Sequence, residues 1–317
     1  LVAHGTANAK TVMEALKQGY EVVACYYPHF ASVRIEHPMV SYVETDITDT
    51  AAEQKALSAA VENKEVTAII HAAALLGSSD FAANEKVNST GVLNMMEFAR
   101  LHGIKRFVYV SSVVVLKQIK GPYGITKLRG QELLTASDLD YTVFIPALIM
   151  GPESLGLNRV LKNVFRFPVF VPLIGKGHET QHPVYVKDFA RAMVASVSIE
   201  KTRRKVYQIA GDRVIAFRDF IALILQHYKK HRIFVPVPVF LAKGLGMLFQ
   251  KTQKVPLFTA EHVKGILQDS NLDIKLLQDD TGYVPTPFEQ ALKESLSHIG
   301  NNWNAMLKAR EERVIKM

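Results

Sequence analysis

The 317-residue sequence has one cysteine, Cys25, and no run of the roughly 18 apolar residues that a membrane-spanning helix needs. A single cysteine excludes an intrachain disulfide and fits a reducing compartment, and its strand-like context indicates a core thiol. The sequence also lacks an RNA-binding motif and aromatics interleaved with its basic clusters, so we expect no nucleic-acid partner. We predict no metal site. These absences indicate a globular protein, and we look for its functional site in the folded core.

Hydrophobic residues make up 48% of the chain and charged residues 21%, enough for one large α/β domain or two smaller ones. The net charge of +8 favours an anionic membrane surface, an acidic partner or an organelle with basic proteins. Leu1 already stands inside a strand-like segment and no targeting segment is visible. Either a leader has been removed or further residues precede Leu1.

Glycine is scarce where a dinucleotide-binding turn requires it. The opening strand, a turn, a helix and the strand 21–27 follow the order of a β-turn-α-β unit that places a pyrophosphate at a helix N-terminus. Of three expected glycines only Gly5 is present, with Thr6 and Asn8 also in the turn, so phosphate binding is weakened or altered. Tyr27 stands where an acidic residue would select NAD, and His29 and Arg34 lie just beyond. This pattern favours NADPH, with NADH as the alternative.

Strands and helices then alternate, which predicts a doubly wound parallel sheet. A strand over 40–43 leads to Asp46 and Ile47, and a helix over 51–63 leads to a strand over 67–74. That strand ends in Ala72, Ala73 and Ala74, small residues that leave room for a cofactor. His71, just before them, is either a core histidine whose ring nitrogens are hydrogen-bonded or part of the strand end beside the cofactor.

A long helix follows over 84–102, and Asn88 near its start reads as a cap or a polar core residue. A further buried strand runs into Pro146.

The most informative stretch runs from Arg106 to Glu132. It predicts a buried strand over 107–110, Ser112 at the strand end, and a helix opened by Gly121 and Pro122. Tyr123 and Lys127 are four residues apart on that helix and project from one face. A lysine beside a tyrosine favours phenolate, and Ser112 could orient a substrate hydroxyl or carbonyl, so the pattern outlines a proton-transfer site. The alternative is an exposed surface pair.

Together these segments resemble the short-chain dehydrogenase/reductase superfamily, in its extended and atypical branches. The resemblance implies a Rossmann-like fold with a smaller C-terminal lobe. It implies that Ser112, Tyr123 and Lys127 are the catalytic trio, that Asp46 binds adenine, that Asn88 is structural and that Pro146 flanks the nicotinamide. The sequence departs from the family in its eroded glycine turn and in the short interval of 11 positions between Ser112 and Tyr123.

The segment 167–193 is similar to a block of the complex I accessory subunits that have this fold, although His182 replaces the expected glutamine. Asp188 in that block would cap the following helix. The apolar stretch 235–249 is either a lid, a docking surface for a membrane or partner, or a core-packed helix. The charged tail from Ala305 is expected to be loose or partner-bound.

We therefore expect a Rossmann domain over 1–150 and an interleaved C-terminal lobe over 151–317. The leading hypothesis is an NAD(P)(H)-binding accessory subunit of mitochondrial respiratory complex I with little or no turnover. It would lie peripherally on the matrix side of the inner membrane, against subunits of that complex and an anionic lipid surface. The competing hypothesis is an active NAD(P)-dependent dehydrogenase or epimerase acting on a sterol-like or sugar-nucleotide hydroxyl.

Overall fold

The computed structural model describes residues 2–3, 6–27, 35–48, 50–152, 154–252, 263 and 267–297. Gly5, His29, Arg34 and the tail from Ala305 lie outside the described residues. Thr6 and Asn8 are described only as backbone positions in a helix.

A seven-stranded sheet in which every neighbouring pair is parallel forms the centre of the molecule. Its order is β11 (Lys205–Ile209), β6 (Asp140–Pro146), β5 (Arg106–Val110), β4 (Ala68–His71), β1 (Val2–Ala3), β2 (Val22–Tyr26) and β3 (Val40–Glu44). The chain order reverses between β1 and β4. In such sheets ligands bind outside the carboxyl ends of the strands at this reversal. The predicted doubly wound, Rossmann-like fold is confirmed.

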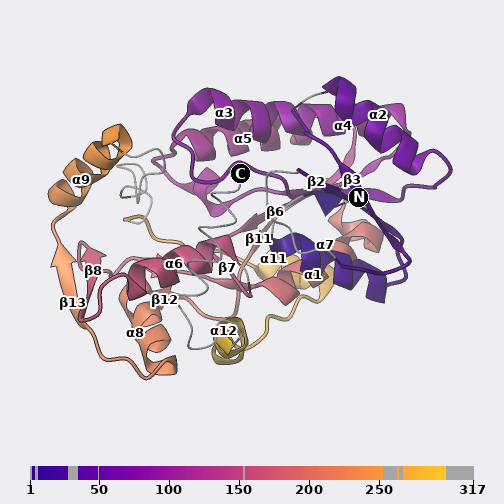
Figure 1. Ribbon diagram of the computed structural model, residues 1–317. Coiled ribbons are helices and arrows are strands. Elements are labelled where there is room, and N and C mark those ends of the chain that lie inside the picture. Colours follow the sequence, from indigo (N-terminus) through magenta and orange to yellow (C-terminus); the bar gives the residue numbers. More distant parts are fainter. Residues whose placement is uncertain are drawn as a thin grey trace.

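Helices cover both faces of the sheet (Figure 1). One face carries α2 (Thr50–Val61), α4 (Gly91–Leu101) and α5 (Pro122–Thr135), and the other carries α1 (Thr6–Lys17), α7 (Val186–Ser198) and α11 (Lys275–Thr281). Side chains of a strand alternate between faces, so Phe107 and Tyr109 join the first core while Val108 joins the second. All three are fully buried, as expected for a strand covered on both sides.

The C-terminal lobe has its own core. It contains α6 (Leu155–Phe165), β8 (Phe170–Ile174), β9 (Thr180–Gln181), β12 (Ile215–Ala216), α8 (Phe217–His227), β13 (Ile233–Val237), α9 (Val239–Thr252) and α12 (Phe288–Ser297). Three two-stranded ladders, β13 with β8, β12 with β9, and β10 (Val184–Tyr185) with β7 (Ile149–Met150), support these helices. Strand β11 pairs with β6 and helix α7 packs on the main sheet, so the lobe interleaves with the Rossmann core. The domain boundary at residue 150 stays a prediction.

No helix in the described ranges is long and apolar enough to cross a bilayer.

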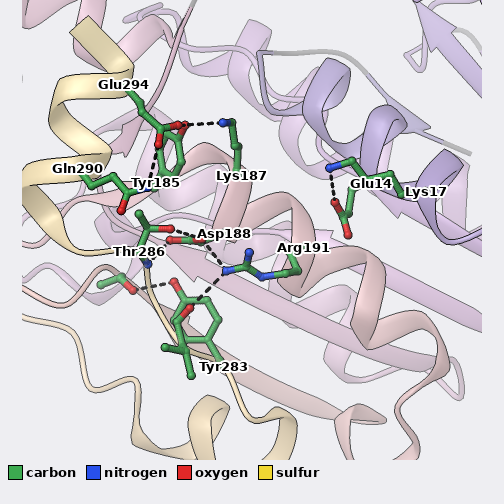
Figure 2. Close-up of polar contacts among 12 residues, drawn as sticks. Glu14, Lys17, Tyr185, Lys187, Asp188, Arg191, Tyr283, Thr286, Gln290 and Glu294 are labelled. Atoms are coloured by element: carbon green, nitrogen blue, oxygen red, sulfur yellow. Dashed lines mark hydrogen bonds and ion pairs between the residues drawn. The ribbon is translucent and has the colours of Figure 1, made fainter. Parts of the chain in front are cut away.

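A polar cluster ties α7 to the chain that precedes α12 (Figure 2). The buried Asp188 carboxylate accepts hydrogen bonds from the Thr286 backbone N–H at 2.6 Å, from the Thr286 hydroxyl at 2.8 Å and from the Arg191 guanidinium at 2.6 Å. The prediction that Asp188 caps its own helix is wrong. Tyr185 occupies the cap position without a side-chain bond, and Asp188 lies in the first turn with its carboxylate turned to Thr286.

We expect Asp188→Ala to lower the free energy of unfolding by about 3 kcal/mol, because it leaves the Thr286 N–H and Arg191 without their shared acceptor. Urea unfolding followed by circular dichroism measures the change. Lys187→Ala is the matched control: its ion pair with Glu294 is solvent-exposed and should contribute less than about 1 kcal/mol. Equal losses in the two variants would contradict this account.

Candidate active site

Ser112 and Tyr123 meet at the carboxyl end of β5. Ser112 stands two residues beyond the strand and precedes a short 3-10 turn, η2 (Val113–Leu116). Gly121 has extended backbone at the N-cap of α5 and Pro122 is the first helical residue, so Tyr123 lies in the first turn. A side-chain hydrogen bond joins Ser112 and Tyr123. The structure thus brings together two residues of the predicted trio.

Desolvation by the surrounding protein raises the pKa of Tyr123 to about 12, and the Ser112 hydrogen bond and the Arg159 charge oppose this shift. Tyr123 therefore remains a phenol at neutral pH. In this state it can donate a proton to a substrate carbonyl, whereas removal of a proton from an alcohol needs further positive charge beside the phenolate.

Lys127 is buried, at 1% exposure, directly beneath the strand end. Its ammonium donates to the Val110 carbonyl at 2.6 Å and lies 4.1 Å from the centroid of the Tyr109 ring. Burial lowers the pKa of Lys127 to about 7. A buried ammonium requires an acceptor, and the strand-end carbonyl supplies it. The positive charge that lowers the pKa of Tyr123 in this structure is that of Arg159, whereas the sequence indicates Lys127. The catalytic role of Lys127 stays a prediction.

Asn88 is a polar core residue that holds the loop after β4 against α5. Its Oδ1 accepts from the Leu75 N–H at 2.9 Å, and its Nδ2 donates to the Thr126 hydroxyl at 3.1 Å. The helix predicted over 84–102 is in fact three consecutive elements: α3 (Phe81–Glu85), a π turn η1 (Lys86–Thr90) and α4. The π turn brings the Asn88 carbonyl so close to Gly130 on α5 that a Cβ there would collide with it. Asn88 therefore supports the site indirectly, by holding the loop after β4 and helix α5 together.

The predicted cofactor residues line the carboxyl edge of the sheet on either side of the strand-order reversal. The Asp46 carboxylate accepts from the Thr48 N–H at 2.9 Å, and the neighbouring Ile47 carbonyl is held by Asn94 at 2.6 Å. Tyr27 directly follows β2 and is half-buried. Pro146 is buried at the end of β6.

A dinucleotide fits this edge of the sheet. Ala73 is buried while Ala72 and Ala74 remain partly exposed, so the end of β4 presents small side chains to the reversal point. Helix α1 begins at Thr6, three residues after β1 ends, and a helix N-terminus offers backbone N–H groups to phosphate. Asp46 and Tyr27 would lie toward the adenosine end, and Tyr123, Lys127 and Pro146 toward the nicotinamide end.

The interval between Ser112 and Tyr123 is fastened to a distant part of the chain. Lys117, in this short loop, is buried and donates to the backbone carbonyls of Gln268 and Asp269 and, at 2.8 Å, to the Ser270 hydroxyl. Asp269 in turn accepts from the Thr180 N–H at 2.7 Å. The loop that carries the site is therefore held by the segment 268–270.

The sequence left His71 open between a hydrogen-bonded core histidine and part of the strand end beside the cofactor, and it gave Arg159 no role. His71 is completely buried, and its ring stacks on Tyr109 at 5.8 Å between centroids. Within the described part of the chain neither of its ring nitrogens has a hydrogen-bond partner. Burial, with a smaller effect of the Lys127 charge, lowers the pKa of His71 to about 3. The second residue is Arg159, on α6, which carries no motif that could have identified it.

Comparison with known proteins places the site in context. A family model described as the NAD dependent epimerase/dehydratase family matches residues 3–210. The mitochondrial NADH dehydrogenase (ubiquinone) 1 alpha subcomplex subunit 9 of Dictyostelium discoideum is 23% identical over 192 residues, covering 60% of this chain and 53% of that protein. A 3beta-hydroxysteroid-dehydrogenase/decarboxylase of Arabidopsis thaliana is 24% identical over 302 residues, covering 82% and 52%. The matches span about half the length of these two curated relatives.

Among solved structures, the dTDP-glucose 4,6-dehydratase of Streptomyces venezuelae with NAD and TYD bound superposes with a TM-score of 0.74. The match covers 95% of this chain and 97% of that chain at 18% sequence identity. This likeness extends across the Rossmann core and the C-terminal lobe and concerns the fold alone.

Proposed function

Because the chain belongs to the NAD dependent epimerase/dehydratase family, we propose that it binds a nicotinamide dinucleotide and serves as an accessory subunit of mitochondrial respiratory complex I. The cofactor lies along the carboxyl ends of β1, β4 and β5, with NADPH preferred over NADH. When bound, it supplies a nicotinamide ring that can donate or accept a hydride. The similarity to the alpha subcomplex subunit 9 of a mitochondrial NADH dehydrogenase supports the role in complex I, although the match covers only about half of that protein.

The observation that carries the assembly role is a set of exposed apolar side chains on β13 and α9, the two elements at the far end of the lobe (Figure 1). We call it the lobe-end surface; its large exposed side chains are Ile233, Val235, Phe240, Leu241, Leu245 and Met247. Phe240 is 78% exposed, Ile233 67% and Met247 54%. Several large apolar side chains exposed to water on two successive elements favour a contact with a partner. This surface would meet subunits of the complex or its anionic lipid surround on the matrix side of the inner membrane.

We expect the replacement of Phe240, Leu245 and Met247 by glutamine to release the protein from a large membrane complex. Apolar anchors carry most of the affinity of such contacts, and glutamine preserves helix propensity, so the Rossmann core should stay folded. Native gel electrophoresis of mitochondrial membranes from cells that express each form measures co-migration.

The control variant replaces Leu93, Leu101 and Val284, exposed apolar residues outside the lobe-end surface, by glutamine. It should co-migrate like the unmodified protein. If the lobe-end variant stays assembled, or if the unmodified protein never co-migrates with a large complex, the accessory role is wrong.

A second candidate function is that of an active NAD(P)-dependent dehydrogenase or epimerase acting on a sterol-like or sugar-nucleotide hydroxyl. The hydrogen-bonded pair of Ser112 and Tyr123 favours it, since a subunit with a purely structural cofactor has no need of this pair. In this role Tyr123 exchanges a proton with the substrate oxygen, Ser112 orients that oxygen, and Lys127 holds positive charge beneath the site. Tyr123→Phe separates the two candidates.

A further inference from the structure

Strands β8 and β13 form a two-stranded parallel ladder, and one face of this ladder is turned away from the lobe core. Val171 and Leu173 of β8 and Phe234 of β13 pack in that core, so the alternate residues of each strand lie on the other face. That face, which we call the ladder face, consists of three register pairs: Phe170 with Ile233, Pro172 with Val235, and Ile174 with Val237. All six residues are apolar and none of them is buried. The ladder therefore presents an entirely apolar face to solvent.

Exposed apolar side chains continue from both ends of the ladder face. At its amino end the Ile233 N–H donates to the Val169 carbonyl at 3.0 Å, and the Val169 side chain is 61% exposed. At its carboxyl end β13 leads into α9, where Phe240 lies in the first turn. Strand β13 and helix α9 follow one another along one side of the lobe (Figure 1). The ladder face, Val169 and the lobe-end surface thus form one continuous region, which we call the apolar strip.

The two segments of chain that build the apolar strip carry an excess of positive charge. Residues 154–178 contain α6 and β8, and residues 220–252 contain most of α8, then β13 and α9. Together they hold nine of the 38 lysines and arginines of the chain and none of its 30 aspartates and glutamates. In the rest of the chain the two signs nearly cancel. The net charge of +8 therefore belongs to this part of the lobe.

Several of these charges gather at the amino end of the ladder. Arg232 joins the turn after α8 to the end of α6, because its guanidinium donates to the Val164 carbonyl at 2.5 Å. Three exposed basic residues stand beside this contact in the chain: Arg166, Lys229 and Lys230. The first carboxylate after β8, that of Glu179, lies beyond the other end of the strand. Basic side chains thus border the apolar strip where Val169 and Ile233 are exposed.

We infer that the apolar strip and its basic end bind the surface of a bilayer that contains anionic phospholipid. Aliphatic and aromatic side chains enter the boundary between headgroups and acyl chains, and lysines and arginines beside them meet the phosphates of the headgroups. A protein surface fits this strip less well, because lysine is depleted in protein interfaces. The inference rests on the proposed accessory role and specifies its partner: the lobe lies on lipid beside the complex.

Sedimentation of the purified full chain with lipid vesicles tests the inference. Vesicles of phosphatidylcholine alone are compared with vesicles that contain about 30% phosphatidylglycerol. We expect the anionic vesicles to bind at least about 10-fold more tightly at about 0.1 M salt. At about 0.5 M salt this binding should weaken without disappearing, because salt screens the charges and leaves the apolar contact.

Lys229→Gln combined with Lys230→Gln should weaken binding to anionic vesicles about 10- to 30-fold, since one basic residue at such a surface contributes about 5-fold. The matched control is Lys105→Gln combined with Lys205→Gln, which removes the same charge from exposed positions on the Rossmann core. The control protein should bind as the unmodified protein does.

Ile233→Gln should weaken binding about 10-fold at both salt concentrations, because it removes a large apolar side chain from the strip. Leu101→Gln is its control: Leu101 is 62% exposed on α4, against 67% for Ile233. This variant should bind as the unmodified protein does. Circular dichroism of each variant shows whether the fold is retained.

Equal binding to the two kinds of vesicle would overturn the inference. Equal losses in the lysine variant and its control would also overturn it, because net charge alone would then explain the binding. If the protein co-migrates with a large complex but does not bind anionic vesicles, the apolar strip contacts a protein subunit, and the accessory role stands without the inference. If it binds anionic vesicles through Lys229, Lys230 and Ile233 but never co-migrates with a complex, the inference stands and the accessory role fails.

Discussion

Tyr123→Phe should lower hydride transfer about 10²- to 10⁴-fold while dinucleotide binding stays close to that of the unmodified protein. The variant removes only the phenol oxygen, which interacts with the Ser112 hydroxyl and would exchange the proton in the second candidate function. The phosphate contacts that we propose at the N-terminus of α1 and the adenosine contacts that we propose at Asp46 are both remote from this oxygen in the chain. Turnover is followed by nicotinamide absorbance, and binding by the dinucleotide released when the purified protein is denatured.

Tyr20→Phe is a suitable control, because Tyr20 lies between α1 and β2, before the amino end of β2 and so at the opposite edge of the sheet. It should leave both measurements unchanged. Equal turnover in Tyr123→Phe and unmodified protein would mean that the proton step occurs elsewhere. A protein that holds dinucleotide but gives no turnover with any substrate would favour the accessory role.

Acid should destabilise the protein through His71. The folded-state pKa of about 3 lies below the ordinary value of 6.5, so the unfolded chain takes up the proton first as the pH falls. The contribution of His71 to stability is complete above pH 6.5 and is lost progressively between pH 6.5 and 3. A shift of this size corresponds to about 4 kcal/mol at pH 3 and about 3 kcal/mol at pH 4.

Urea unfolding at pH 7, 5 and 4 tests this expectation. His71→Phe should lose less stability on acidification than the unmodified protein, since phenylalanine cannot titrate and the site is apolar and aromatic. Carboxylates add their own acid dependence, which cancels in the difference between the two proteins. His178→Phe, at an exposed position, should behave as the unmodified protein does. If His71→Phe and unmodified protein lose the same stability, the ring does not stay neutral in the folded state.

The fold could be predicted from the sequence because periodicity and chain order determine it. Buried runs such as Phe107–Val110 alternate with helical segments, and this order permits few arrangements other than a doubly wound sheet. Tyr123 and Lys127 could be placed on one helix face by spacing alone.

The partners of individual side chains could not be predicted in the same way. The Lys127 ammonium bonds to the Val110 carbonyl, a contact that depends on how α5 packs against β5. The Arg159 guanidinium lies against Gly77, in the loop after β4, because α6 of the lobe packs close to the core, which no local pattern encodes. The π turn that seats Asn88 depends likewise on the close approach of Gly130.

The Lys117 contacts have a consequence for the order in which the site is completed during synthesis. Lys117 bonds to acceptors that begin at Gln268, 151 residues further along the chain. A ribosome therefore exports the strands of the dinucleotide edge, and Ser112 and Tyr123 themselves, long before the segment that fastens the loop between them. It follows that the strands around Ser112 and Tyr123 leave the ribosome well before the segment that fastens the loop between these two residues, so this loop is among the last parts of the described chain to be held in place.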